Sequence, residues 1–226
     1  LTVLRAVPGQ ELRVGVIDGP IGRAVMVRHD PGGVTLQCTF DAATPGRPRV
    51  DLLLALPRPK VLRRLWAQVA ALGVGRVILT NAERVERHYF DTHLLAPEAV
   101  RALLVEGLEQ ARDTRLPAVT VHRRFRPLVE DELDSLSDAD VRLTASPDAG
   151  ATVAQGLAAP AHRVLLAVGP EGGWNRFELD LLAAHRFREV GMGARTLRSD
   201  TATVALLALV HQALGAAAPR PAADTR

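Results

Sequence analysis

Short runs of alternating apolar and polar residues fill the first forty positions of the chain. Such runs stand at residues 12–16, 24–27 and 34–38, and turn-forming segments rich in Asp, Gly and Pro separate them. Alternation with a period of two is typical of half-buried β-strands, and such turns usually join antiparallel strands. The pattern predicts a small antiparallel sheet. An aperiodic linker is expected after it, over residues 42–48.

From residue 50 onward, short apolar runs alternate with longer segments of helical spacing. Strands are predicted at residues 50–56, 76–80, 118–121, 141–144 and 164–168. Apolar residues three and four positions apart predict helices over residues 61–72, from Pro97 onward, and over residues 202–214. Residues 125–138 show no periodicity, so we expect a loop there that could hold one helical turn. Strands alternating with helices form a mostly parallel sheet, and the expected fold class is α/β.

Composition narrows the protein class. With 226 residues, of which 47% are hydrophobic, the chain can build one good core and a small appendage. It has no apolar run near the roughly 18 residues of a membrane helix, so no membrane partner is expected. The single cysteine, Cys38, cannot form an internal disulfide and is expected to pack in a strand, which fits a cytoplasmic protein. The histidines are scattered without ligand spacing, so we expect no metal site.

Almost all positive charge in the chain is arginine, because Lys60 is the only lysine. Arginine suits the recognition of phosphates and base edges. Basic residues gather in two stretches of sequence, namely Arg58, Lys60, Arg63 and Arg64, and Arg112, Arg115, Arg123, Arg124 and Arg126. The net charge of the chain is only +3. The two basic stretches are therefore either ordinary solvated surface charge or contacts to RNA phosphates.

The residues after the apolar run 164–168 form a candidate ligand site. The run is typical of a central strand buried on both faces, and Gly169-Pro170-Glu171-Gly172-Gly173 follows it at once. Three glycines in five residues let the backbone approach a ligand closely, although a tight connection without a ligand is the alternative. Asn175 and Glu178 then form a capping-box pattern that predicts a helix start. Open α/β sheets bind ligands at this end of a strand.

A second segment has the same character. The residues Glu189-Val190-Gly191-Met192-Gly193 resemble a short strand that runs into another close-approach turn. Polar residues follow, and the helix predicted over 202–214 is apolar on most faces. Such a helix must be buried in the core or against a partner subunit.

These two motifs carry a resemblance to a known family. The pairing of V-G-P-E-G-G-W-N with G-M-G-A-R-T-L-R-S-D-T-A, about twenty residues later, resembles the RsmE family of 16S ribosomal RNA uracil-N3 methyltransferases. This resemblance implies a SPOUT methyltransferase domain over residues 47–218 with a C-terminal trefoil knot. Residues 1–46 look like the latter part of a PUA-like β-barrel whose opening strands would precede Leu1. We expect a disordered tail at residues 219–226.

The resemblance also implies S-adenosylmethionine as cofactor, small-subunit ribosomal RNA as substrate, and a homodimer. Carried over by position, the cofactor site comprises Val168, Gly169, Glu171, Gly172, Gly173, Met192, Gly193, Leu197, Arg198, Thr201 and Ala202. The chain departs from the family's pattern at Gln68, Ala71 and Asp113, which leaves the RNA target open.

N3 of uridine carries a proton on the Watson–Crick edge, so its methylation needs an unpaired base and loss of that proton. Arg198 is the expected donor to the charge that develops on the uracil oxygens. We expect Asp200 to orient Arg198 or accept the proton, and Lys60 to contact the RNA or the uracil. A purely structural Arg198–Asp200 ion pair is the alternative. Two other functions remain open: a SPOUT enzyme for another RNA or atom, and a non-catalytic RNA-binding protein.

Overall fold

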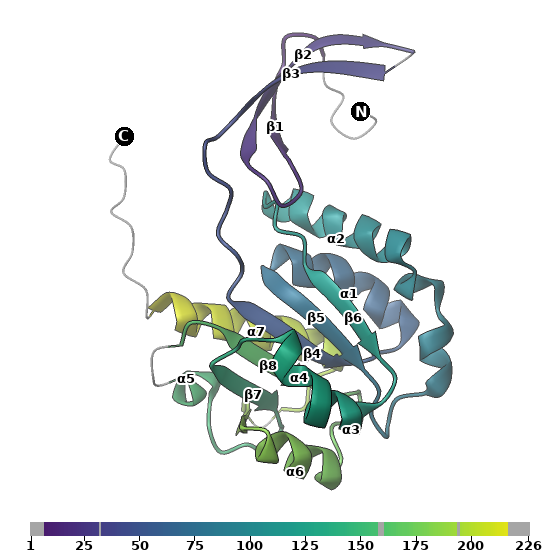
Figure 1. The fold of residues 1–226 in the computed structure, drawn as a ribbon, viewed down its shortest axis with the longest axis vertical. Coiled ribbons are helices and arrows are strands. Elements are labelled where there is room, and N and C mark those ends of the chain that lie inside the picture. Colours follow the sequence, from purple (N-terminus) through teal and green to yellow (C-terminus); the bar gives the residue numbers. More distant parts are fainter. Residues whose placement is uncertain (1–6, 32, 158–160, 194, 217–226) are drawn as a thin grey trace.

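A six-stranded parallel sheet forms the centre of the larger part of the protein (Figure 1). The computed structural model describes residues 7–31, 33–157, 161–193 and 195–216. The strands lie in the order β6-β5-β4-β8-β7-β9. Their bounds are β4 Val50–Ala55, β5 Val74–Thr80, β6 Ala118–His122, β7 Val141–Ala145, β8 Val164–Val168 and β9 Phe187–Val190. The α/β class and the parallel sheet predicted from the sequence are therefore confirmed.

Helices follow most of these strands. They are α1 Pro59–Ala71, α2 Pro97–Ala111, α5 Val153–Gly156, α6 Arg176–Ala184 and α7 Ser199–Ala216, with short 3₁₀ turns at Arg87–Asp91 and His93–Leu95. Pro59 stands in the first turn of α1, where a missing N–H is tolerated, and Gly73 (φ 73°) follows its end. The last helix begins three residues before the predicted start.

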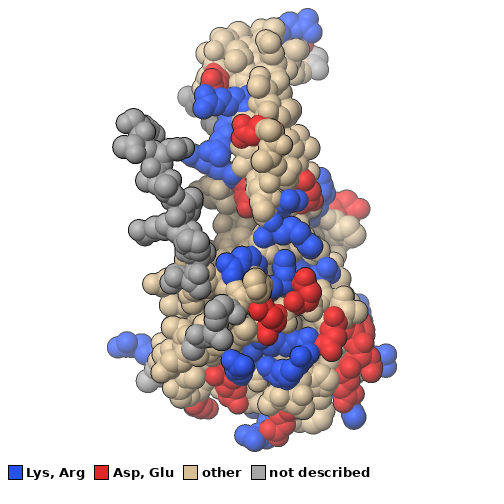
Figure 2. Space-filling model, turned by 60° about the vertical axis from the view of Figure 1, so that its left-hand side comes forward, with Lys and Arg blue, Asp and Glu red and all other residues tan. Residues whose placement is uncertain are grey.

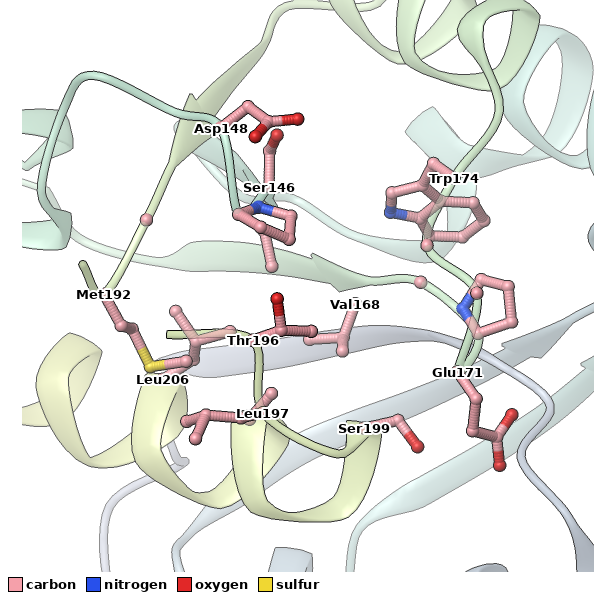
Figure 3. Close-up of a pocket in the computed structure, with 18 of the residues that line it drawn as sticks. Ser146, Asp148, Val168, Glu171, Trp174, Met192, Thr196, Leu197, Ser199 and Leu206 are labelled. Carbon is pink, nitrogen blue, oxygen red and sulfur yellow. The ribbon is translucent and has the colours of Figure 1, made fainter. Parts of the chain in front are cut away.

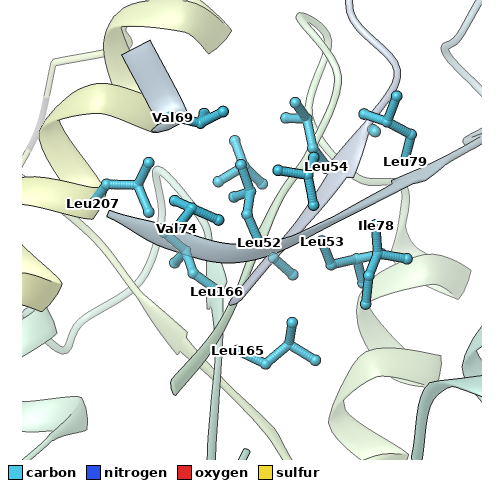
Figure 4. Packing of buried hydrophobic residues seen from close by; sticks show 14 of the residues in the cluster. Leu52, Leu53, Leu54, Val69, Val74, Ile78, Leu79, Leu165, Leu166 and Leu207 are labelled. Carbon is cyan, nitrogen blue, oxygen red and sulfur yellow. The ribbon is translucent and has the colours of Figure 1, made fainter. Parts of the chain in front are cut away.

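The central strands β4 and β8 are buried on both faces, as the apolar run at 164–168 predicted. Leu52 and Leu54 point toward Val69 of α1 and Leu207 of α7, whereas Leu53 lies on the opposite face of the sheet with Ile78 and Leu165 (Figure 4). Helices thus cover the sheet on both sides. This double cover explains why β8 is wholly apolar, and β4 apolar from Leu52 to Ala55, rather than alternating.

The segment 125–138 was expected to be a loop, and this expectation is wrong. It forms helical turns α3 Phe125–Pro127, η3 Leu128–Glu132 (π-helical) and α4 Leu133–Leu136. These turns bury Phe125, Leu128, Val129 and Leu133 against the sheet. The buried positions do have helical spacing, but Pro127 and the acidic residues between them concealed it in the sequence.

The predicted antiparallel sheet is present, with β1 Glu11–Gly15, β2 Ile21–Asp30 and β3 Gly33–Phe40. Figure 1 shows this sheet projecting from the larger body. The turn between β1 and β2 is anchored there, because Asp18 N–H donates to the Thr114 carbonyl (2.7 Å) and Thr114 Oγ1 donates to the Gly19 carbonyl (2.7 Å). The predicted linker, residues 42–48, contains no helix or strand.

Cys38 does not pack as expected. It lies on β3 opposite Ala24 and is exposed, because β3 is an edge strand that is open to solvent along most of its length. The predicted tail at 219–226 lies outside the described residues. None of the described helices is long and apolar enough to cross a membrane.

Candidate functional site

The carboxyl ends of β7 and β8 open onto a cavity of about 310 Å³ (Figure 3). Four segments, distant in the sequence, form its wall. They are residues 168–174 after β8, residues 145–148 after β7, residues 190–193 and 195–197 after β9, and Ser199, Ala202 and Leu206 of α7. Arg84 joins them from the loop after β5. Ligands bind at this edge of open α/β sheets, and the volume suits a small molecule.

The glycine turn after β8 is a close-approach loop, as its sequence predicted. Gly173 N–H donates to the Pro170 carbonyl (2.8 Å), and Gly173 has φ 73°, a conformation that side chains disfavour. Arg84 lies across the turn and donates from Nη1 to the Gly172 carbonyl. A Cβ atom on Gly172 would lie 2.7 Å from Arg84 Cδ. The turn therefore has no room for a side chain at Gly172 unless Arg84 moves.

A buried carboxylate holds the start of α6 against the loop after β5. Asn175 and Glu178 form the predicted capping box, with Glu178 N–H donating to Asn175 Oδ1 (2.7 Å) and Asn175 N–H donating to Glu178 Oε2 (2.8 Å). Glu178 is only 3% exposed, and its Oε1 also accepts from Glu83 N–H (2.8 Å). This contact fixes the backbone next to Arg84 and so places the arginine at the cavity.

The loop after β9 closes the other side of the cavity. Gly191 approaches the β7 loop so closely that a Cβ would lie 3.1 Å from the Ser146 carbonyl oxygen, and Gly193 has φ 104°. Of the residues expected to bind a cofactor, those that line the cavity are Val168, Gly169, Glu171, Gly172, Gly173, Met192, Gly193, Leu197 and Ala202. Arg198 and Thr201 are exposed and do not line it.

The three candidate catalytic residues make no hydrogen bond or ion pair with one another in the part of the chain that the structure describes. The exposed Arg198 side chain makes no hydrogen bond or ion pair with any residue that the structure describes. Asp200 pairs instead with Arg64 on α1, with 2.6 Å between Oδ2 and Nη2. Lys60 is exposed in the first turn of α1. The Arg198–Asp200 contact considered from the sequence is absent from the described residues.

Two hydrogen bonds stabilise the ionised carboxyl group of Asp200. Burial alone would raise the pKa of its carboxyl, but hydrogen bonds from the Thr201 N–H and from Arg64 outweigh burial and hold that pKa below its ordinary value. A carboxylate with a lowered pKa is a weaker base. In this geometry, Asp200 ties the start of α7 to α1.

The basic stretch on α1 lies beside the cavity. Arg58 N–H donates to Glu171 Oε1 (3.5 Å), and the Arg58 Nε atom is 3.9 Å from the same oxygen. Since Arg64 reaches Asp200, the first turns of α1 contact the β8 turn and the start of α7. Lys60 and Arg63 are exposed on the same helix. On the face of the molecule that Figure 2 shows, Lys and Arg side chains are interspersed with Asp and Glu side chains.

The second basic stretch is divided by strand β6. Arg112 and Arg115 precede the strand, and Arg115 Nε donates to the Pro45 carbonyl (2.6 Å). Arg123, Arg124 and Arg126 follow it beyond the other end of the strand, where Arg126 pairs with Glu130. The sequence cluster is thus two separate groups, and part of it has a structural role.

Sequence reasoning did not select several residues of the cavity wall, including Arg84, Ser146, Asp148, Trp174, Thr196 and Leu206. One signal was available for Arg84, Ser146 and Asp148, because each follows the carboxyl end of a strand in a parallel sheet. The described residues contain no group of three or more His, Cys, Asp or Glu side chains arranged to hold a metal ion.

Comparisons with known proteins agree on one family. Residues 45–211 match the family model described as RNA methyltransferase domain. The chain is 37% identical over 162 residues to Ribosomal RNA small subunit methyltransferase E of Treponema pallidum, a match that covers 71% of this chain and 61% of the relative. It is 26% identical over 211 residues to the Mycobacterium bovis protein of the same name, covering 92% and 80%. The chain thus spans less than two thirds of the Treponema relative.

Solved structures share the fold. The Neisseria gonorrhoeae Ribosomal RNA small subunit methyltransferase E, bound to S-adenosyl methionine, superposes with a TM-score of 0.78. It is 19% identical, and the match covers 93% of this chain and 86% of that protein. The putative methyltransferase Lpg2936 of Legionella pneumophila, in complex with the same cofactor, gives a TM-score of 0.74 at 20% identity, covering 93% and 86%.

Proposed function

The chain belongs to the RNA methyltransferase domain family, and from this membership we propose that it methylates N3 of an unpaired uridine in small-subunit ribosomal RNA with S-adenosylmethionine. One observation carries the proposal. The two motifs that resembled the RsmE family, although separated in the sequence, line the same cavity at the carboxyl edge of the sheet. The names of the Treponema and Mycobacterium relatives support ribosomal RNA as the substrate. We propose the cytoplasm as the place of action.

The cavity wall fits the proposed cofactor. Its glycine turn presents backbone groups rather than side chains, and a Cβ at Gly169 or Gly172 would collide with neighbours. Apolar side chains of Val168, Met192 and Leu206 offer contacts for an adenine ring, and Asp148 and Ser146 offer polar ones. The bound cofactor would supply an electrophilic methyl group on its sulfonium.

We assign the remaining chemistry to residues at the rim of the cavity. Arg198 has a guanidinium free to donate to the uracil oxygens on which charge develops as N3 loses its proton. Asp200 holds α7 to α1 through Arg64 and positions Arg198 two residues away. Lys60 and the exposed arginines of α1 would contact the RNA backbone beside the cavity. The small β-sheet is proposed as part of a PUA-like RNA-binding barrel.

We further propose a homodimer formed through α7. Leu209 of this helix is 38% exposed, and it borders an apolar groove with Val153 of α5 and Ala213. A second copy would cover this surface, which water otherwise contacts.

A knot is also proposed. The chain leaves β9 at the edge of the sheet and returns to its centre, where α7 contacts β8 and β4. Pulling a disulfide-free chain by its two ends would test the knot, because a knotted chain stretches to less than the roughly 3.3–3.6 Å per residue of a full extension.

Methylation mapping tests the function. The purified protein, ribosomal RNA or small subunits that lack the modification, and methyl-labelled cofactor are incubated together, and the labelled nucleotide is located. A methyl group on N3 blocks Watson–Crick pairing, so reverse transcriptase should stop beside one uridine. Labelling of another RNA or atom would favour the related-enzyme alternative. Cofactor binding without any transfer would favour the non-catalytic alternative.

A further inference from the structure

Trp174 forms a rigid part of the cavity wall. It is 7% exposed, and its ring packs against Phe125 with 5.2 Å between ring centroids. On the other side lies Gly169, where a Cβ would come within 3.2 Å of Trp174 Cδ1 and Cγ. The backbone of Trp174 is fixed as well, because the next residue caps α6. The indole therefore has one orientation.

The polar atom of this ring has no partner in the protein. Trp174 Nε1 is buried and makes no hydrogen bond with any described residue. The other tryptophan of the chain, Trp66, behaves differently, since its Nε1 donates to the Leu94 carbonyl (3.2 Å). Buried indole N–H groups usually find an acceptor, and one left without a partner in a native protein calls for an explanation.

The cavity supplies that explanation. Trp174 is one of its wall residues, and the indole nitrogen lies on the edge of the ring turned toward Ser146 across the cavity (Figure 3). A ligand in the cavity can bring an acceptor to this nitrogen, for which no described residue supplies one. An indole N–H only donates, so it selects an oxygen or an unprotonated nitrogen.

We propose that Trp174 Nε1–H donates a hydrogen bond to an acceptor atom of the bound cofactor and so positions it in the cavity. The proposal rests on the proposed function, which places S-adenosylmethionine there. The carboxylate, the ribose oxygens and the adenine nitrogens of that molecule are suitable acceptors. Trp174 would thus contact the cofactor directly and hold it in position.

Trp174→Phe removes the N–H group and keeps an aromatic ring between Phe125 and Gly169. Calorimetry with S-adenosylmethionine should show affinity reduced about 5- to 10-fold, the usual effect of losing one hydrogen bond. The free variant should lose stability only through the smaller ring, because the lost N–H group has no partner in the protein. Trp66→Phe is the matched control. It should lower the free energy of unfolding through the lost bond to Leu94 and leave cofactor affinity unchanged.

Fluorescence gives a readout that needs no change at Trp174. In Trp66→Phe all tryptophan emission comes from Trp174, and titration with the cofactor should shift or quench it with the calorimetric dissociation constant. Should that variant unfold, the difference between wild-type and Trp174→Phe spectra reports the same signal.

Equal affinity of wild type and Trp174→Phe for the cofactor would overturn the inference and leave the proposed function standing. A loss confined to the KM for RNA would also overturn it, by placing the acceptor on the base. A wild-type protein that does not bind the cofactor would overturn the proposed function together with the inference.

Discussion

Replacing Gly172 tests whether the turn after β8 must stay free of side chains. In Gly172→Ala the new Cβ would lie 2.7 Å from Arg84 Cδ, whereas non-bonded carbon atoms prefer roughly 3.5–4.0 Å. Arg84 would have to move by about 1 Å. It cannot do so freely, because its guanidinium is bonded to the carbonyl of Gly172 itself. The substitution therefore displaces a residue of the cavity wall.

Overpacking of this kind typically costs about 1–3 kcal/mol. If the strain is relieved at the cavity wall, the affinity for S-adenosylmethionine should fall by about 5- to 150-fold. Gly172→Val adds two methyl groups at the same place and should abolish binding. Backbone strain contributes little, because Gly172 is not among the residues with positive φ.

Isothermal calorimetry measures the affinity, and thermal unfolding shows whether each variant folds. Gly150→Ala is the matched control, since a Cβ at Gly150 meets no atom within 4 Å. Arg84→Ala provides a second background in which the obstructing side chain is absent, and there Gly172→Ala should cost much less. A folded Gly172→Val that binds the cofactor as the wild type does would refute the assignment of the cavity. An equal cost of Gly172→Ala in both backgrounds would refute the steric role of Arg84.

Arg198→Ala should leave cofactor affinity nearly unchanged and lower the single-turnover methylation rate by on the order of 100-fold, as for a lost transition-state donor. Arg58→Glu combined with Arg63→Glu should weaken RNA binding and lower the slope of log affinity against log salt by up to about 1.4–1.8, measured by filter binding at several salt concentrations. Leu209→Glu should convert the proposed dimer to a monomer in sedimentation velocity. Burial alone would raise the pKa of the Asp140 carboxyl, but hydrogen bonds from the N–H groups of His162 and Arg163 outweigh burial and lower it. The ionised Asp140 side chain therefore stabilises the folded protein above about pH 4, and this stabilisation is lost as the pH falls. The stability difference between wild type and Asp140→Asn should therefore shrink on acidification, as urea unfolding at several pH values would show.

Matched variants sharpen these tests. Asp200→Asn should affect the rate less than Arg198→Ala, because Asp200 contacts Arg64 rather than the uracil. A wild-type rate for Arg198→Ala would move the catalytic role to Lys60 or the loop backbone. Arg101→Glu, on α2, should leave the slope of log affinity against log salt unchanged. An unaltered slope in the Arg58→Glu, Arg63→Glu double variant would mean that these arginines are ordinary surface charge and do not contact RNA. Phe177→Glu, at another exposed apolar residue, should not alter the oligomeric state. A Leu209→Glu protein that remains dimeric would place the interface elsewhere.

Much of the candidate site could be read from local sequence. The glycine turn at 169–173 and the capping box of Asn175 and Glu178 depend only on residues a few positions apart, and the structure contains both. Arg84 was not selected, since its partner, the Gly172 carbonyl, lies 88 residues away. The Arg64–Asp200 pair spans 136 residues, and the sequence instead suggested Asp200 as a neighbour of Arg198.

The sequence by itself determined most of the elements, namely a small antiparallel sheet followed by strands that alternate with helices, because apolar spacing and turn residues act within a few positions. It did not reveal the helical turns between Phe125 and Leu136. Tertiary structure alone decided the strand order β6-β5-β4-β8-β7-β9, in which β8 pairs with β4 and β9 with β7 across long stretches of chain. That order brings the ends of β7, β8 and β9 around one cavity. The physical reason is that backbone pairing and burial favour any compatible strand neighbour. The packing of the whole core decides which strands become neighbours, and no short stretch of sequence contains that information.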